Sequence, residues 1–113
     1  MVGIVVVAHN PKLSQEIINF CMELKNSDFM LENGGGLEND NGYGTCPEVI
    51  TKAIRRANQG DGVVILCDLG SSVINAETAK EKLKNEIRVE RVDAPIVEGT
   101  IVGVSSNHPK VNL

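Results

Sequence analysis

The chain has 113 residues, which predicts a single domain, residues 1–113, large enough to bury an ordinary core. Its net charge is −4 and its basic residues are scattered, which argues against a surface for nucleic acid. Aromatic residues make up only 3%, so stacking platforms for bases or flavins are not expected. The first apolar run is too short for a membrane span and has no basic leader, so no membrane association is predicted. Three cysteines without a C-x-x-C motif predict reduced thiols in a cytoplasmic protein.

The N-terminal part of the chain predicts a buried strand followed by an amphipathic helix. The apolar run from Val2 to Ala8 is typical of a buried strand. Asn10 can cap the next helix, with Pro11 in its first turn, and apolar residues recur at helical spacing from 13 to 24. His9 therefore stands at the carboxyl end of a first strand, where open α/β sheets bind their ligands.

A glycine-rich loop separates the next two predicted elements. Residues 29–31 can form a short second strand, and residues 33–44 then form a loop with five glycines. A loop of this length is either functional or an ordinary surface segment, and both interpretations stay open. Thr45, with Glu48 three residues later, matches a capping box and predicts a helix that ends near Gly60.

The second half of the chain continues the alternation of strands and helices. Residues 62–67 read as a third strand that ends at Asp68, and Ser71 or Ser72 can cap the helix that follows. Alternating charged and apolar residues at 87–92 predict a fourth strand near an edge of the sheet.

The C-terminal region carries two conflicting signals. The β-branched residues of 96–104 favour a strand, whereas Pro95 before them favours a helix start. Residues 105–113 show no clear final helix. The whole pattern predicts an open, mostly parallel α/β sheet of order 2-1-3-4 with helices on both faces.

In this strand order His9 and Asp68 would flank one cleft, because they end neighbouring strands. A carboxylate that accepts the Nδ1 proton fixes the imidazole tautomer and leaves Nε2 free as a nucleophile or base. The segment Gly70-Ser71-Ser72 opens a helix, so its backbone N–H groups can bind an anion. The alternative for this segment is an ordinary helix cap.

Several other kinds of site are not supported. The glycine loop is followed by no Gly-Lys-Ser/Thr and does not fit G-x-G-x-x-G, and a calcium loop would lack its final Glu. The spacing of the histidines and acids predicts no metal site. Cys46 is interpreted as a structural thiol, with a catalytic pair with His9 as the alternative, and Cys21 and Cys67 are expected in the core.

Four segments together resemble a known family. They are His9 after its strand, the glycine loop leading into Gly44-Thr45, Asp68-Leu69-Gly70-Ser71 with Asn75 and Glu77, and the stretch from Asp93 to Gly99. Together they look like the phosphotransferase subunit of the phosphoenolpyruvate-dependent dihydroxyacetone kinase, which is similar to the mannose-type IIA domains of the sugar phosphotransferase system. The resemblance runs from Val2 to about Val104. Ser72 stands where alanine is common in this family, Cys46 where serine is common and Thr100 where alanine is common.

The resemblance implies a phosphotransferase that works as a phosphohistidine relay. The phosphocarrier HPr would phosphorylate His9, and His9 would pass the group to ADP held in the nucleotide-binding kinase subunit. Asp68 would orient the ring, and no bound cofactor is expected besides the covalent phosphohistidine. The residues expected to contact phosphate are Gly35, Thr45, Gly70, Ser71 and Ser72. A homodimer is also implied.

Two alternative functions remain open on the sequence. The chain could be a sugar-specific mannose-type IIA domain, or a non-enzymatic regulatory module that is switched by phosphorylation of His9. No arginine lies beside any of the motifs, so a cation for the transition state is expected from the partner protein.

Overall fold

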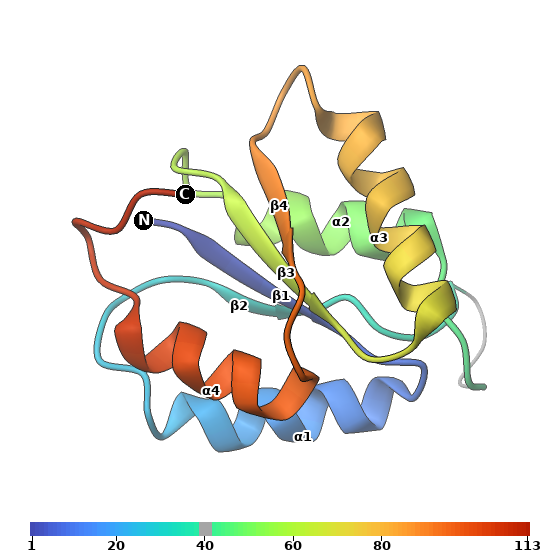
Figure 1. The fold of residues 1–113 in the computed structure, drawn as a ribbon, viewed down its shortest axis with the longest axis horizontal. Helices are drawn as coiled ribbons and strands as arrows, with labels where there is room; N and C mark the ends of the chain where they lie inside the picture. Colours follow the sequence, from blue (N-terminus) through green and yellow to red (C-terminus); the bar gives the residue numbers. More distant parts are fainter. Residues whose placement is uncertain (39–41) are drawn as a thin grey trace.

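In the computed structural model, which describes residues 1–38 and 42–113, a four-stranded sheet lies between two pairs of helices (Figure 1). In chain order the elements are β1 (Gly3–Val7), α1 (Pro11–Met22), β2 (Leu31–Asn33), α2 (Pro47–Ala57), β3 (Val63–Cys67), α3 (Gly70–Leu83), β4 (Val89–Val92) and α4 (Ile96–Ser106). Helices α1 and α4 cover one face of the sheet, and helices α2 and α3 cover the other.

All strands of the sheet are parallel, and their order β2-β1-β3-β4 is the order that the sequence predicts. β1 pairs with β3 along its whole length, from Gly3 opposite Val63 to Val7 opposite Cys67. The chain leaves β1 for one edge of the sheet, through α1 and β2, and returns through α2 to the other side of β1. The topological switch point therefore lies between the carboxyl ends of β1 and β3.

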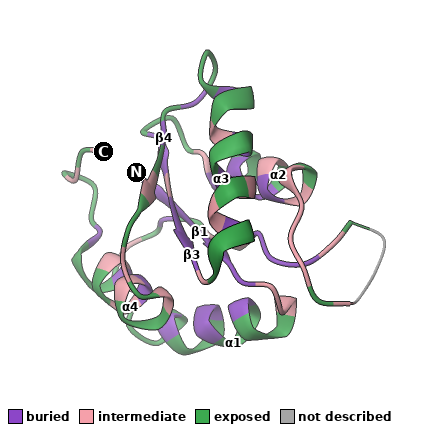
Figure 2. Cartoon of the chain, turned by 45° about the vertical axis from the view of Figure 1, so that its right-hand side comes forward, coloured by how far each residue is buried: buried purple, intermediate pink, exposed green. Residues whose placement is uncertain are grey.

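The central strands supply the core on both faces of the sheet (Figure 2). All five residues of β1 are buried, as its apolar run predicts. Val5 and Val7 belong to the cluster beneath α2 and α3, and Ile4 and Val6 belong to the cluster beneath α1 and α4. Because successive side chains of a strand point to opposite faces, this continuous apolar run requires helices on both sides.

Two elements differ from their predicted positions by a few residues. The second strand is formed by residues 31–33 and not by residues 29–31. Phe29 is fully buried, but it precedes the strand and fills the cluster beneath α1 and α4. In α1 the buried face is turned by about one residue from the predicted one. Its buried residues are Ser14, Ile17, Ile18 and Cys21, whereas Leu13, Phe20 and Leu24 are exposed.

The caps of α2 and α3 also differ from the predicted ones. Cys46, not Thr45, is the N-cap of α2, and its side chain makes no capping hydrogen bond. Helix α3 begins at Gly70, so Ser71 and Ser72 lie inside its first turn and do not cap it. The hydroxyls of Thr45, Ser71 and Ser72 each bind another side chain instead of capping a helix.

Residues 96–104, for which the sequence signals conflict, are helical. They form helix α4 together with residues 105–106. Its β-branched residues are accommodated because Thr100 and Val104 are buried against the sheet. The Thr100 hydroxyl donates to the Ile96 carbonyl at 2.6 Å, so it brings no unpaired polar group into the core. Neither α4 nor any other helix within residues 1–38 and 42–113 is long and apolar enough to cross a bilayer.

β4 is an edge of the sheet, as its charge pattern predicts. Its charged side chains pair with α3. Arg91 donates to Glu77 at 3.1 Å, and Lys80 lies 3.6 Å from Glu90. These pairs place charge along the free edge, a feature that hinders uncontrolled strand addition.

Candidate functional site

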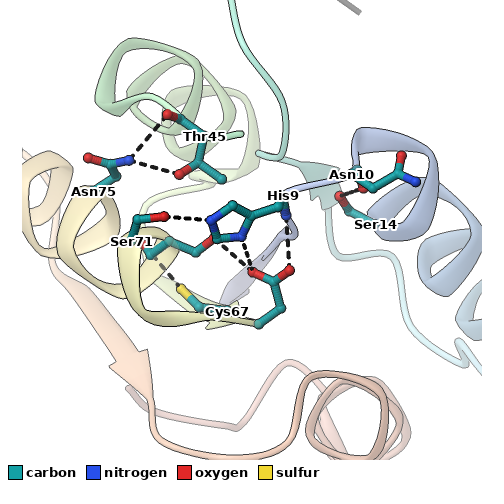
Figure 3. Close-up of polar contacts among 9 residues, drawn as sticks. His9, Asn10, Ser14, Thr45, Cys67, Ser71 and Asn75 are labelled. Atoms are coloured by element: carbon teal, nitrogen blue, oxygen red, sulfur yellow. Dashed lines mark hydrogen bonds and ion pairs between the residues drawn. The ribbon is translucent and has the colours of Figure 1, made fainter. Parts of the chain in front are cut away.

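The site lies where β1 and β3 end, at the switch point of the sheet (Figure 3). Pairing between these strands continues past β3, because the Asp68 N–H donates to the Val7 carbonyl at 3.2 Å. His9 follows Val7 by two residues, so the backbone itself brings the His9 and Asp68 side chains together. The structure thus joins the two residues that the sequence places at neighbouring strand ends.

Asp68 holds His9 through both of its carboxylate oxygens. Oδ2 accepts the backbone N–H of His9 at 3.0 Å, and Oδ1 lies 3.1 Å from Nδ1 of the ring. The backbone of His9 has a second contact, because its carbonyl accepts the N–H of Gly44 at 2.6 Å. Backbone and ring are therefore fixed together, and Nε2 is directed away from Asp68.

The hydrogen bonds at Asp68 keep it ionised at neutral pH, although its side chain is only 13% exposed. Burial by itself raises the pKa of this carboxyl, but hydrogen bonds from the His9 N–H, the Ser72 hydroxyl, the Leu69 N–H and the His9 ring together lower it. An ionised carboxylate only accepts hydrogen bonds, so the shared proton belongs to Nδ1 of His9. The lone pair of the neutral imidazole is then on Nε2, which can act as a nucleophile.

Nε2 of His9 faces the first turn of α3. The Ser71 hydroxyl lies 2.5 Å from Nε2 and donates to its lone pair. Gly70 and Ser71 are the first two residues of the helix, so their N–H groups have no carbonyl one turn earlier to bind. The approach is open, since a Cβ on Gly70 would have no atom within 4 Å. An anion bonded to Nε2 would meet these donors and the positive end of the helix dipole.

Two residues that the sequence assigns to phosphate binding are engaged in other contacts. The Gly35 N–H donates to the Asn33 side chain at 2.9 Å, and a Cβ on Gly35 would lie 2.5 Å from the Ala8 carbonyl oxygen. This glycine therefore serves close backbone packing. Ser72 is fully buried, and its N–H donates to the Leu69 carbonyl at 2.9 Å. The positions of Gly35 and Ser72 do not support the expectation that they contact phosphate.

Thr45 stands across the site on the loop that precedes α2, and Asn75 of α3 holds it in place (Figure 3). The Asn75 amide donates to Oγ1 of Thr45 at 2.8 Å and to its carbonyl at 3.2 Å. A parallel bridge between Gly36 and Thr45 closes the base of the glycine-rich loop, of which residues 39–41 lie outside the described residues. Because the Thr45 hydroxyl accepts from Asn75, its own proton is available for another acceptor. The sequence gives Asn75 no role of its own, because its contact reaches 30 residues back along the chain.

The three thiols have different surroundings. Cys21 and Cys67 are buried, as predicted. Burial raises the pKa of both thiols, and that of Cys67 rises to about 11. Both are therefore protonated at neutral pH and unsuited to act as nucleophiles. Cys46 is partly exposed, and no hydrogen bond joins it to His9 in the part of the chain that the structure describes.

One group of possible metal ligands lies beside Cys46, although the sequence spacing predicts none. The ligand atoms of Glu38, Cys46 and Glu48 lie within 4.8 Å of one another. Each of the two carboxylates already has a cationic partner. Lys52 donates to Glu38 at 3.0 Å, and Lys82 lies 3.6 Å from Glu48. The lysines thus balance the negative charge that would attract a cation.

The site combines an oriented imidazole nucleophile with hydrogen-bond donors aimed at an anion. This chemistry suits a carrier domain, which takes an anionic group on a histidine nitrogen and releases it again. Comparison with protein families gives the same class. The family of PTS system fructose IIA components (EIIA-man) matches residues 3–110. The chain belongs to this family of the phosphotransferase system.

Related proteins make the family relationship more specific. The phosphoryl donor subunit DhaM of the PEP-dependent dihydroxyacetone kinase 2 from Listeria innocua is 32% identical over 101 residues, which are 88% of this chain and 80% of that protein. The corresponding DhaM from Escherichia coli is 32% identical over 110 residues, which are 94% of this chain but only 23% of that protein. The chain therefore spans most of the first relative and one portion of the second.

A solved structure shows the same fold. The crystal structure of EF1359, a protein of unknown function, superimposes with a TM-score of 0.81 and 27% sequence identity. The match covers 93% of this chain and 81% of that chain. This chain therefore shares its fold with that protein.

We predict that Asp68→Asn destabilises the protein in a pH-dependent way. The folded-state pKa of Asp68 lies below its ordinary value, so its contribution is present above about pH 4 and is lost as the pH falls through the folded pKa. The difference in free energy of unfolding between the native protein and the variant should be largest at about pH 6–7 and shrink toward about pH 3. Urea denaturation at a series of pH values measures it.

Glu16→Gln on the exposed side of α1 is the matched control, because it removes one carboxylate that has no part in the site. A destabilisation by Asp68→Asn that stays constant over the whole pH range would contradict the assignment of an ionised Asp68.

Proposed function

We propose that this chain is a phosphohistidine carrier in a PEP-dependent dihydroxyacetone kinase. HPr donates a phosphoryl group to Nε2 of His9, and His9 passes it to ADP bound in the nucleotide-binding kinase subunit. The observation that carries this proposal is the double contact of Asp68 with His9, in which the carboxylate accepts the Nδ1 proton and leaves the Nε2 lone pair as the nucleophile. The phosphoryl donor role of the DhaM relatives supports it.

The transfer needs no proton movement at His9. The Nε2 lone pair attacks phosphorus while the bond between phosphorus and the donor nitrogen breaks, and Nδ1 keeps its proton. The ring then carries positive charge, which the Asp68 carboxylate balances at 3.1 Å. On discharge the Nε2–phosphorus bond breaks, an oxygen of ADP takes the phosphoryl group, and the lone pair returns to Nε2.

Donors at the start of α3 stabilise the charge of the transferred group. We assign this role to the N–H groups of Gly70 and Ser71 and to the Ser71 hydroxyl. The Thr45 hydroxyl is a further donor, from the other side of the site. Phosphoryl transfer depends mainly on positioning and on charge stabilisation, so such donors contribute directly to the rate.

The cation for the transition state comes from the partner in this proposal. Among the described residues, the ion pairs of lysine and arginine are made with glutamates, and the one pair of Asp68 is with His9. The chain has a net charge of −4, which favours the approach of a basic partner surface. A partner that brings its own arginine or lysine would complete the site only when it docks.

The proposed docking surface consists of exposed apolar side chains on the segments that contact His9. Leu69 precedes α3 and Ile74 lies one turn into this helix. Tyr43 precedes Gly44, whose N–H binds the His9 carbonyl. These side chains are 64%, 66% and 77% exposed. Large apolar side chains exposed around a polar centre are typical of contact surfaces between proteins. In this proposal donor and acceptor use this surface in turn, because Asp68 and Ser72 occupy the Nδ1 side of the His9 ring.

A homodimer is also proposed, on a different surface. Two apolar cavities of about 320 and 350 Å³ follow the free edge of β4 and the adjoining side of α4, and Val64, Val92 and Gly103 line both. Val102 of α4 is 65% exposed beside them. A second copy of the chain would cover this face and leave the His9 surface free.

We predict that His9→Ala abolishes labelling by radioactive phosphoenolpyruvate in a mixture of enzyme I and HPr. His108→Ala is the matched control, because the chain has only these two histidines and His108 lies exposed near the C-terminus. It should be labelled like the native protein. Acid-labile label retained by His9→Ala would overturn the proposal.

The labelled protein also distinguishes the possible acceptors. We expect rapid loss of label and formation of ATP when the ADP-loaded nucleotide subunit of the kinase is added. Transfer to a mannose-type IIB domain instead would identify a sugar-specific IIA domain. A label that neither acceptor removes would identify a regulatory module.

We predict that Ile74→Ser raises the apparent KM for phosphorylated HPr by about five- to tenfold and leaves the rate at saturation unchanged. The reason is that the side chain contributes binding and no chemistry, and a five- to tenfold change corresponds to a loss of about 1–1.4 kcal/mol of binding free energy. Phe20→Ser is the control, since Phe20 is similarly exposed near the far end of α1. Equal effects of the two variants would contradict the docking surface.

We predict that Val102→Asp converts a dimer into monomers in sedimentation analysis. A carboxylate on this face would be desolvated on association without a partner charge. Phe20→Asp adds the same charge to α1 and should leave the dimer intact. A native protein that sediments as a monomer at all concentrations would rule out the dimer.

A further inference from the structure

Ser72 is fully buried beside the His9–Asp68 pair, and its hydroxyl contacts both residues. Oγ lies 2.7 Å from Oδ1 of Asp68 and 3.1 Å from Nδ1 of His9. Oδ1 lies 3.1 Å from the same ring nitrogen. Three polar atoms thus form a closed triangle on the Nδ1 side of the ring, between side chains that are largely buried.

The protons available decide which atom donates and which accepts in each contact of this triangle. An ionised Asp68 has no proton to give, so the Ser72 hydroxyl must donate to Oδ1. A hydroxyl has only one proton, and Oγ therefore presents lone pairs to Nδ1. Oδ1 and Oγ are then both acceptors at the same nitrogen. In a ring without a proton on Nδ1, the Nδ1 lone pair would point at the lone pairs of Oδ1 and Oγ, and this contact would be repulsive.

We propose that Ser72 is a positioning residue of the phosphoryl relay, a second acceptor that acts with Asp68 to keep the proton of His9 on Nδ1. This inference rests on the proposed function, because it concerns the same histidine. Ser72 acts through the ring and does not touch the transferred group. Its burial and the direction of its hydroxyl separate it from Ser71, which lies at the other nitrogen.

The two adjacent serines contact opposite ends of the imidazole with opposite polarity. Ser71 donates to the lone pair of Nε2 at 2.5 Å, and Ser72 accepts the proton of Nδ1. Both contacts favour the same tautomer, so the ring is held by three side chains. The first turn of α3 places both hydroxyls, because successive helix residues point in directions about 100° apart.

The proton on Nδ1 matters in both directions of the relay. During uptake it ensures that the lone pair is on Nε2, where the new bond to phosphorus forms. During discharge the Nε2–phosphorus bond breaks, and the ring leaves as neutral imidazole with Nδ1 still protonated. If Nδ1 had lost its proton in the phosphorylated state, the leaving group would be an imidazolate anion, which is a far poorer one. A second acceptor at Nδ1 therefore assists both steps.

The test combines ¹⁵N NMR of the His9 ring with phosphoryl-transfer kinetics on Ser72→Ala. The spectra are taken at pH 8.5, above the range in which histidine side chains usually titrate. We expect the native ring to be almost entirely the Nδ1–H tautomer, and the share of the Nε2–H tautomer to rise by about two- to tenfold in Ser72→Ala. Uptake from phosphorylated HPr at saturation should slow in proportion to the share of the Nδ1–H tautomer that is lost, with KM unchanged.

Two further variants separate positioning from packing. Ser14→Ala is the matched control, since Ser14 is also a fully buried helix serine and its hydroxyl donates to a backbone carbonyl. It should lower the melting temperature without changing the tautomer. Ser72→Thr keeps the hydroxyl and should restore the native tautomer, whereas Ser72→Cys keeps the size but is a weak acceptor and should behave like alanine.

An unchanged tautomer in both Ser72→Ala and Ser72→Cys would overturn the inference, even if transfer became slower. If the tautomer is altered in these variants but HPr fails to label the native protein, the role of Ser72 at the ring is upheld and the proposed function is rejected. The NMR measurement needs no partner protein, so the two failures are distinguishable.

Discussion

The parallel pairing of β1 with β3 is the constraint on which the site depends. The five paired positions and the Asp68–Val7 hydrogen bond set the register, and the register places Asp68 beside the backbone and the ring of His9. A slip of one residue would turn each side chain of a strand to the other face of the sheet, so the core and the site would be lost together. Packing of Val5 and Val7 on one face and of Ile4 and Val6 on the other thus fixes the histidine as well.

The buried side of the site is built around one negative charge. Asp68 is mostly removed from water, and its cost is met by four hydrogen-bond donors from His9, Leu69 and Ser72. The exposed side presents hydrogen-bond donors, and the lysine and arginine ion pairs among the described residues are made with glutamates. This division fits a phosphoryl carrier, because the ring is held from the buried side while Nε2 stays accessible to the transferred group.

The sequence predicts a large part of this arrangement because its strongest signals are local. The apolar runs, the Asn10-Pro11 helix start and the alternation of elements give the strand order, which the structure confirms. His9 and Asp68 could be paired from that order alone. The phosphate contacts predicted at Gly35 and Ser72 are less well supported, because local spacing does not reveal that Asn33 and Leu69 already accept from their N–H groups. The caps of α2 and α3 differ from the predicted ones for a related reason: the hydroxyls of Thr45, Ser71 and Ser72 have partners in Asn75, His9 and Asp68.

What the sequence by itself determined is the periodicity of the core, the order of the strands, and the two residues that end the central pair. These follow from burial of apolar faces and from the handedness of crossovers, which act through neighbours along the chain. Only the tertiary structure decided the helical state of residues 96–106, the direction of each hydroxyl around His9, and the clasp between Asn75 and Thr45. A hydrogen bond is specified by distance and angle between atoms, and for residues 30 to 63 positions apart these exist only once the sheet has formed.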